Sequence, residues 1–369
     1  MRILFAGLLL LLPGLFADQS RGPQTAEYCG DCHRAIYEGW KQSVHATAME
    51  SRLFQDALKM AESDFNGDAR KVCLRCHSPL AASSEDLALT RKVSWEGITC
   101  DYCHSVQEVT PTRSNPIARM EFNGVKSGPS AHAVSPVHGT RFSPVHTTSL
   151  LCSTCHEYRN ALGFHVLTTY SEWENSPYAK SGQVCQSCHM YGVQGKIADV
   201  RVRTDSGGGI NVHRMPGSRS VDQLNRAIQS QIATTRQGDK VKVVVKLTNA
   251  GAGHYVPTGS PMRKLILEVR LDPFGEGQPQ RVERVYARRV QDQMGTTLER
   301  EHLAFLRGAK VVEDTRFAPK ETRTETFTFD LPASRRARVE ANLYYFYSPM
   351  ARTEAEQKIR FLAVSRLVQ

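Results

Sequence analysis

Five copies of the motif Cys-x-x-Cys-His contain all ten cysteines of this 369-residue chain. Two thiols followed by an adjacent histidine have the spacing of a c-type haem attachment site, where the thiols bond the porphyrin and the histidine ligates its iron. The copies are Cys29, Cys32 and His33; Cys73, Cys76 and His77; Cys100, Cys103 and His104; Cys152, Cys155 and His156; and Cys185, Cys188 and His189. We therefore predict five covalently bound haem c groups.

Two other uses of paired cysteines fit the pattern less well. A structural zinc ion binds four ligands, so five groups of three ligands could not be divided among zinc sites without leaving some ligands unused. A disulfide across a two-residue loop is typical of redox-active pairs, which need no adjacent histidine. Haem attachment is the interpretation that uses every residue of the motif.

The second axial position of each iron decides what a haem does. A sixth protein ligand closes the iron to substrate and suits electron relay, whereas an open position admits a substrate. Eight of the 13 histidines lie outside the motifs, so the count permits histidine pairs at all five irons. They are His45, His132, His138, His146, His165, His213, His254 and His302.

The first 17 residues predict an exported protein. Arg2 gives a positive start, residues 3–16 are apolar, and Ala17 is a small residue for cleavage, as in a secretory signal peptide. The apolar run of about 14 residues is shorter than the roughly 20 that span a bilayer. We expect a periplasmic or extracellular protein with no transmembrane segment in the mature chain.

The cysteine map divides the mature chain in two. All five motifs lie between Cys29 and His189. We expect a mainly helical and irregular multihaem cytochrome c domain at residues 18–224, with a helix from Arg34 to about Met60 and irregular backbone between Pro111 and Pro144. Its 207 residues provide little chain for each of five haems, so the haems must pack against one another.

Residues 225–369 show a two-residue hydrophobic period instead. Ile228 to Thr234 and Val241 to Leu247 alternate on either side of Gly238 and Asp239, which predicts a β-hairpin. The same period recurs at Leu265 to Leu271, Thr324 to Leu331 and Arg338 to Tyr347. We predict an all-β, immunoglobulin-like sandwich.

Charge is also divided between the two parts. Lys plus Arg against Asp plus Glu is 21 against 21 for residues 18–224 and 25 against 16 for residues 225–369. Haem propionates would make the first domain acidic. Either the domains complement each other at their interface, or the basic domain orients the protein on a redox partner protein or an anionic membrane surface. Nucleic acid is not an expected partner of an exported haem protein, and the sequence leaves the oligomeric state open.

Several segments resemble one family. The stretch from Trp40 to Ala46 after the first motif resembles the distal-histidine segment of the cytochrome c-554-like multihaem cytochromes. Similar segments are Ser135 to His138, Tyr170 to Met190, His213 to Gly217 and Gly253 to Gly259. The resemblance implies a multihaem electron carrier. The best-known carrier of this type has four haems, so its ligand scheme does not transfer whole to a chain with five motifs.

The resemblance and the local chemistry together select five distal ligands. They are His45, His138, His146, His213 and His254, with His132 and His165 in reserve, whereas His302 lies among charged residues and is expected to be solvated. A ligand at His254 would clamp the β domain to the haem domain. Otherwise the glycines around it, Gly253 and Gly259, serve only tight turns.

The sequence thus predicts an exported protein that relays electrons between redox partners through five closely packed haems with mostly paired histidines. One alternative is an oxidoreductase that acts on a small nitrogen or sulfur oxyanion at one five-coordinate haem. Another is a subunit of a conducting filament. Electron transfer without catalysis is the favoured interpretation, so no catalytic residue is assigned.

Overall fold

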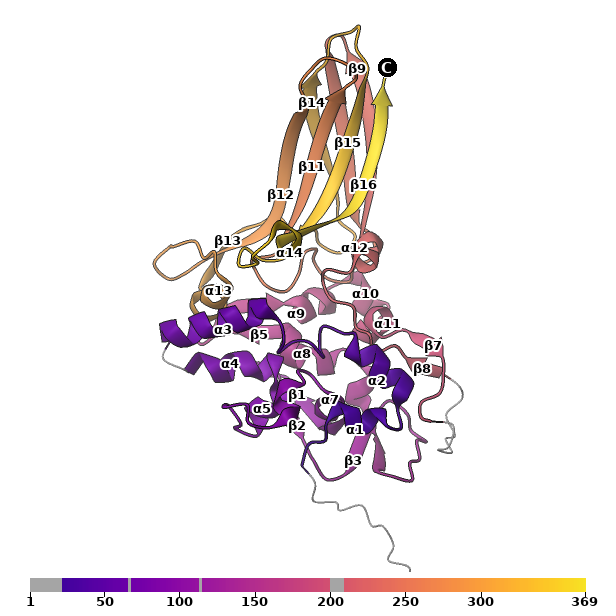
Figure 1. Cartoon of the computed structure of the whole chain (residues 1–369), viewed down its shortest axis with the longest axis vertical. Coiled ribbons are helices and arrows are strands. Elements are labelled where there is room, and N and C mark those ends of the chain that lie inside the picture. Colours follow the sequence, from indigo (N-terminus) through magenta and orange to yellow (C-terminus); the bar gives the residue numbers. More distant parts are fainter. Residues whose placement is uncertain (1–21, 66–67, 113–114, 200–208) are drawn as a thin grey trace, which may run out of the picture.

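The computed structural model has a helical region below and a region of long strands above (Figure 1). It describes residues 22–65, 68–112, 115–199 and 209–369. The signal peptide predicted at residues 1–17 lies outside these ranges. In the described part of the chain, no helix has the length and hydropathy to cross a membrane.

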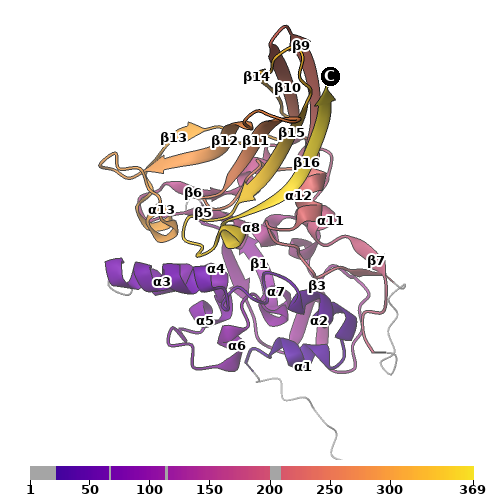
Figure 2. The same cartoon turned by 45° about the horizontal axis from the view of Figure 1, so that its top comes forward.

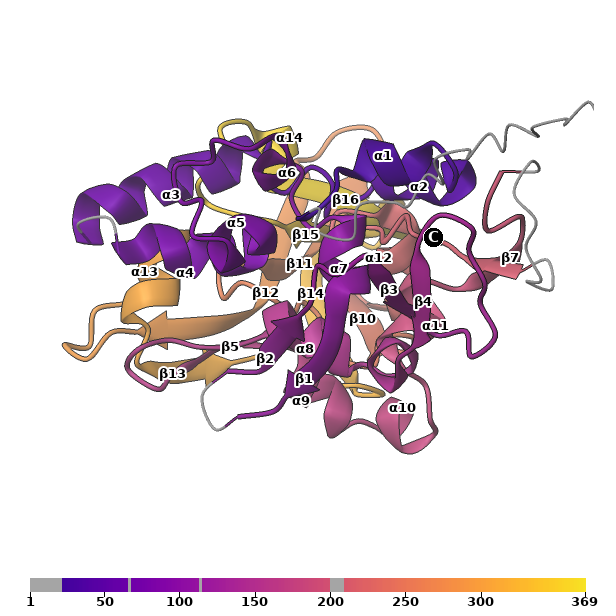
Figure 3. The same cartoon turned by 90° about the horizontal axis from the view of Figure 1, so that it is seen from below.

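Short helices dominate the first region, and four of the five Cys-x-x-Cys-His motifs lie within them. The helices are α1 (Ala26–Gly30), α2 (Arg34–Lys41), α3 (Arg52–Phe65), α4 (Asp68–His77), α5 (Pro79–Ser83), α6 (Lys92–Trp95), α7 (Cys100–Ser105), the 3₁₀ turn η1 (Pro144–Thr147), α8 (Leu150–His156), α9 (Thr169–Glu174), α10 (Pro177–Lys180) and α11 (Cys185–His189). Seen from below, α1 and α2 lie on one side of this region and α9 and α10 on the other, with α7 between them (Figure 3).

The helix predicted from Arg34 to Met60 is interrupted in the structure. It ends at Lys41, and α3 begins only at Arg52. The Ser43 hydroxyl accepts a hydrogen bond from the Ala46 amide, and a serine side chain that satisfies nearby backbone in this way competes with helix formation. The turn that results carries His45, whose carbonyl accepts the Ile98 amide 3.1 Å away.

Four small ladders brace the irregular parts of the first region. They pair β1 (Val106–Thr110) with β2 (Ile117–Met120), β3 (Val125–Gly128) with β4 (Gly139–Phe142), β5 (Glu157–Arg159) with β6 (His165–Thr168), and β7 (Gly192–Gln194) with β8 (Gly209–Asn211). Residues 111–144, expected to be irregular, therefore include three short strands. Only the β3–β4 ladder is parallel among these four.

The second region consists of two antiparallel sheets. The strands are β9 (Ile228–Gln237), β10 (Lys240–Asn249), β11 (Lys264–Pro273), β12 (Gln280–Gln291), β13 (Lys310–Asp314), β14 (Thr322–Asp330), β15 (Ala337–Phe346) and β16 (Lys358–Val368), and the helices are α12 (Val221–Ala227), α13 (Glu301–Arg307) and α14 (Glu354–Gln357). One sheet has the order β14-β10-β9 and the other β13-β12-β11-β15-β16. The predicted hairpin is confirmed, since β9 pairs with β10 across Gly238, whose φ is +62°.

A single apolar core joins the two sheets. It includes Val241, Val243, Val245 and Leu247 of β10, each with 0% exposure, and the alternate residues of β11 and β15. Their two-residue period is the pattern from which the strands were predicted. The first region has only small clusters of buried apolar side chains, such as the six residues around Leu74. It therefore has little core made of protein alone.

Polar contacts join the β region to the helical region. The Arg316 guanidinium, on the β side, donates to Glu172 of α9 at 2.7 Å, and the Arg288 guanidinium donates to the carbonyls of His165 and Val166 at 2.6 and 3.0 Å. Helix α13 of the β region lies beside α3 of the helical region (Figure 2). The β region therefore contacts the helical region through α9, through β6 and through α3.

Candidate functional site

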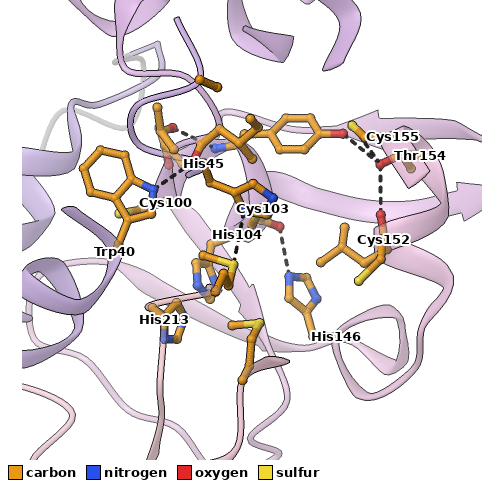
Figure 4. Close-up of a pocket in the computed structure, with 18 of the residues that line it drawn as sticks. Trp40, His45, Cys100, Cys103, His104, His146, Cys152, Thr154, Cys155 and His213 are labelled. Atoms are coloured by element: carbon orange, nitrogen blue, oxygen red, sulfur yellow. Dashed lines mark hydrogen bonds between the residues drawn. The ribbon is translucent and has the colours of Figure 1, made fainter. Parts of the chain in front are cut away.

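A cavity of about 1920 Å³ is lined mainly by the helical region and in one part by the β region. Ligand pockets in proteins are commonly about 300–1,000 Å³, so this space suits more than one large group. Cysteines and histidines of the first four motifs line it, as do Gln186 of the fifth motif and Met190, which follows that motif. Figure 4 shows part of the lining, including Cys100, Cys103, Cys152 and Cys155 and the imidazoles of His45, His104 and His213.

Four of the five motifs place both thiols and the imidazole on one face of a helix. In α4, α7, α8 and α11 the two cysteines and the histidine occupy helical positions i, i+3 and i+4. Those positions share one face of a helix. The first motif differs, because Cys29 lies in α1 and His33 caps α2, yet the His33 amide still donates to the Cys29 carbonyl at 2.9 Å.

Four motif histidines each face a second histidine across a similar gap. The ring centroids are 6.2 Å apart for His33 and His138, 6.3 Å for His156 and His45, 6.4 Å for His104 and His213, and 6.4 Å for His189 and His254. A metal–imidazole bond of about 2 Å puts the ring centroid about 3.1 Å from the metal, so two imidazoles on opposite sides of one metal have centroids roughly 6.3 Å apart. The spacing fits an iron between each pair.

Backbone carbonyls fix the orientation of these imidazoles. The Nδ1 atoms of His33, His138, His104, His213 and His254 lie 2.6–2.9 Å from the carbonyl oxygens of Ile197, Gly139, Ser127, Asn211 and Tyr255, respectively. A carbonyl accepts only from a protonated nitrogen, so each of these rings carries its proton on Nδ1 and leaves Nε2 free. Metal-binding histidines commonly have this arrangement.

Burial also keeps the imidazoles neutral. It lowers the pKa of His45, His77 and His189 to about 4 and that of His104 and His156 to about 3. All five are then uncharged at neutral pH. A neutral imidazole is the form that binds a metal.

His77 of the second motif has a different environment. Its ring stacks on Phe54 with centroids 3.8 Å apart, and its buried Nδ1 has no hydrogen-bond partner. Among the described residues, no second imidazole lies at the 6.2–6.4 Å spacing from His77. Any group held by this motif therefore lacks the histidine pair found at the other four.

His146, the fifth predicted distal ligand, lies beside His104 at a centroid distance of 5.5 Å. Its Nε2 is 2.9 Å from the Cys103 carbonyl, and Figure 4 shows this bond. The nitrogen left free is Nδ1, in contrast to the paired histidines. Of the two reserve histidines, His132 lines the cavity and is exposed, and His165 lies 3.5 Å from Glu157.

The expectation that His302 is solvated was wrong. It is 4% exposed, lines the cavity, and has its Nε2 2.9 Å from Asp64 of α3. The charged neighbours in the sequence gave the wrong indication, because α13 turns His302 toward α3. Arg263 and Glu301 also line the cavity. Sequence reasoning missed all three, since they come from a region without a motif.

Contacts among cysteines show which motifs are neighbours. Cys29 and Cys100, Cys76 and Cys155, and Cys152 and Cys185 are free thiols that lie close enough to shift the pKa of each other's side chain. Cys103 of the third motif also lies near Cys155 of the fourth. The five motifs thus form one connected group in which the fourth borders the second, third and fifth. Together with the cavity and the imidazole pairs, this donor set fits several haem c groups.

Comparison with known proteins agrees with this chemistry. Residues 28–105 match the family model described as cytochrome c554 and c-prime. No curated protein matches. The crystal structure of a penta-heme cytochrome c552 from Thermochromatium tepidum matches with a TM-score of 0.74 and 22% identity, covering 94% of this chain and 99% of that chain.

Two further solved structures align with much less of the chain. A hypothetical protein from Pyrococcus horikoshii OT3 has a TM-score of 0.20 at 13% identity, with 39% of this chain and 90% of that chain covered. A superoxide reductase in the oxidised state has 0.19 at 13%, with 38% and 86% covered. Neither adds to the argument. Residues 28–105 are thus similar to the cytochrome c554 and c-prime family, and 94% of the chain shares its fold with the penta-heme cytochrome c552.

Proposed function

We propose that this protein is an exported pentahaem cytochrome that relays electrons between redox partner proteins. The observation that supports this most directly is the set of four imidazole pairs with centroids 6.2–6.4 Å apart. Haem iron held between two histidines changes oxidation state without exchanging a ligand, which is the chemistry that electron relay needs.

The ligand scheme follows from the pairs. His33 and His138 hold the first haem, His104 and His213 the third, His156 and His45 the fourth, and His189 and His254 the fifth. For the second haem, the described residues offer His77 without a second imidazole at this spacing. His146 remains a candidate ligand, but its Nε2 bond to the Cys103 carbonyl argues against it.

The cysteine contacts suggest the order of the haems in space. The first haem neighbours the third, the third neighbours the fourth, and the fourth also neighbours the second and the fifth. Because electron tunnelling falls steeply with distance, neighbours exchange electrons fastest. The fourth haem is then the branch point of the relay.

Mass spectrometry and electron paramagnetic resonance test the proposal. The mature protein, produced in a host that attaches haem c, should carry the mass of five haems. The oxidised protein should give low-spin signals for four haems and a high-spin signal for one. A protein with fewer attached haems, or with mainly high-spin iron, would contradict the relay.

The environment of His77 favours a second candidate function. A haem with one axial histidine can bind a small molecule, so the protein would reduce or oxidise a nitrogen or sulfur oxyanion there. Carbon monoxide should then bind one of the five reduced haems, and nitrite or sulfite should reoxidise the reduced protein with turnover. Carbon monoxide binding without turnover would leave the relay as the function.

The charge distribution suggests which surface of the protein binds a redox partner or a membrane. The β region has an excess of nine positive charges, 25 against 16, which would orient the protein on an acidic partner or an anionic membrane surface. Binding to vesicles containing anionic lipid, and none to neutral vesicles, would support the membrane version. Assembly into a filament predicts a scattering mass that grows with protein concentration.

A further inference from the structure

A group of polar side chains from the β region lines one part of the haem cavity. Arg263, Glu301 and His302 all border it, and Glu301 and His302 begin helix α13. The electron-relay chemistry of the four histidine pairs uses none of them. Such a cluster inside a cofactor cavity calls for a separate explanation, because burying charge is costly unless the charge is paired or used.

Helix α13 borders the second haem motif. Phe305 of α13 stacks on Tyr158 at a centroid distance of 6.1 Å, and burial, with a further contribution from Cys76 and Cys73, raises the pKa of that tyrosine to about 12. Helix α13 also packs against α3, whose Phe54 stacks on His77. Through Phe305, helix α13 therefore borders the side of the cavity where the second motif is attached, and Glu301 lies one turn before Phe305 on the same helix.

Glu301 places a titratable carboxyl in the lining of the cavity, where it accepts a hydrogen bond from the Ser260 hydroxyl. Burial raises the pKa of its carboxyl, and hydrogen bonds from Ser260 and Ser348 together with the charge of Arg263 act against that shift. Burial has the larger effect, so the pKa of the Glu301 carboxyl lies above its ordinary value. Several titratable or charged groups surround it. His302 lies on the same helix and contacts Asp64 of α3. The others are Arg263, just before β11, and Tyr345 and Tyr347 near the end of β15.

A path to solvent leads away from this carboxyl. The Asp64 side chain is 42% exposed and the His302 side chain 1%, and their Oδ2 and Nε2 atoms are 2.9 Å apart. The other nitrogen of His302, Nδ1, is buried without a hydrogen-bond partner. A surface carboxylate bonded to a buried imidazole next to a cavity carboxyl is an arrangement that can pass a proton inward.

We propose that Glu301 takes up a proton when the haem attached at Cys73 and Cys76 is reduced, and that Asp64 and His302 deliver it. A redox partner donates one electron and iron(III) becomes iron(II). A proton from water forms an O–H bond on the Glu301 carboxylate, so the charge of the cavity is unchanged. The inference rests on the proposed function, because it needs a haem at this motif.

The pH range of the effect follows from the two oxidation states. Adding an electron makes the cavity more negative, so the Glu301 pKa is higher in the reduced protein than in the oxidised one. Below both pKa values the carboxyl is protonated in either state, and above both it is ionised in either state. Proton uptake of up to one per electron belongs to the range between them, above the ordinary glutamate pKa of about 4.3.

Redox titration of the holoprotein across pH tests this. Wild-type protein should show one haem whose potential falls with rising pH in that range, and Glu301→Gln should remove the dependence. Glu299→Gln, which changes an exposed carboxylate two residues earlier, should leave it intact. If the potential of that haem still depends on pH in Glu301→Gln, as it would if a haem propionate took up the proton, the proposal is overturned.

Two milder variants keep the test decisive if Glu301→Gln does not fold. Ser260→Ala removes a hydrogen bond that lowers the Glu301 pKa, so the pH range should move upward; an unmoved range contradicts the assignment. Asp64→Asn should leave the equilibrium curve unchanged but slow the proton-linked phase of reduction, and an unchanged rate removes the delivery path. Five attached haems with four low-spin signals, but no effect of these variants, would refute this inference alone.

Discussion

The histidines of this protein fall into two classes, according to which ring nitrogen makes a hydrogen bond. His33, His104, His138, His213 and His254 commit Nδ1 to a backbone carbonyl, whereas His146 and His302 commit Nε2. Sequence spacing identifies the motif histidines, because each follows its two cysteines within five consecutive residues. It does not identify their opposite ligands, which come from remote segments and depend on which nitrogen is free.

His254 gives the sharpest test at this scale. Its centroid lies 6.4 Å from that of His189, so His254→Ala should leave the fifth haem without a sixth ligand. We expect one additional high-spin haem in the electron paramagnetic resonance spectrum of the oxidised protein, with all five haems still attached. His165→Ala is the matched control, because His165 belongs to none of the four pairs and should leave the spectrum unchanged. An unchanged spectrum in His254→Ala, with normal folding, would refute its role as a ligand.

At the scale of elements, the strands were predictable and the helix boundaries in the haem region were not. The strands of the β region bury alternate residues in a protein core, so the period of the sequence shows them directly. Around the cavity, apolar residues face space that suits a cofactor, and helices there end where a side chain such as Ser43 satisfies the backbone. The arrangement of the two sheets as an immunoglobulin-like sandwich stays a prediction.

Gly97 supports the turn that carries His45. Its φ is +69°, and an added Cβ would collide with the His45 carbonyl oxygen. Gly97→Ala should therefore lower the free energy of unfolding by about 1–2 kcal/mol for the backbone conformation and by about 1–3 kcal/mol more for the overlap. Gly163→Ala, at φ +78° with open space around it, should show only the first cost. Urea denaturation measures the free energy of unfolding of both variants. If it falls by the same amount in both, the turn accommodates the added methyl group without strain.

The contact between α9 and the β region depends on a buried ion pair. The side chains of Arg316 and Glu172 are 7% and 6% exposed and lie 2.7 Å apart. Arg316→Gln leaves Glu172 buried without that partner, so it should cost about 3–5 kcal/mol of stability. Arg289→Gln breaks a pair that is 59% and 48% exposed, and should cost less than about 1 kcal/mol. Denaturation of both variants checks this, and a loss as small for Arg316 as for Arg289 would contradict it.

At the scale of the whole molecule, the β region contributes more than a separate domain. It supplies His254 opposite His189, and it places Arg263, Glu301 and His302 in the cavity lining. The sequence indicated His254 through its glycine-rich surroundings. It gave no sign of the other three, because their place in the cavity depends on how α13 packs against α3.

The connectivity of the motifs makes a prediction about the complete relay. If the fourth haem is the branch point, replacing Cys152 and Cys155 with alanine should remove it and isolate the second and fifth haems from the first and third. An electron delivered by a fast photochemical donor should then equilibrate incompletely among the four remaining haems. Replacing Cys29 and Cys32 instead removes a haem at the end of the network, so the other four should equilibrate as rapidly as in the wild type. Mass spectrometry should confirm that each variant carries four haems. If electrons equilibrate rapidly in both variants, loss of the fourth haem has no more effect than loss of the first, and the fourth haem is not the branch point.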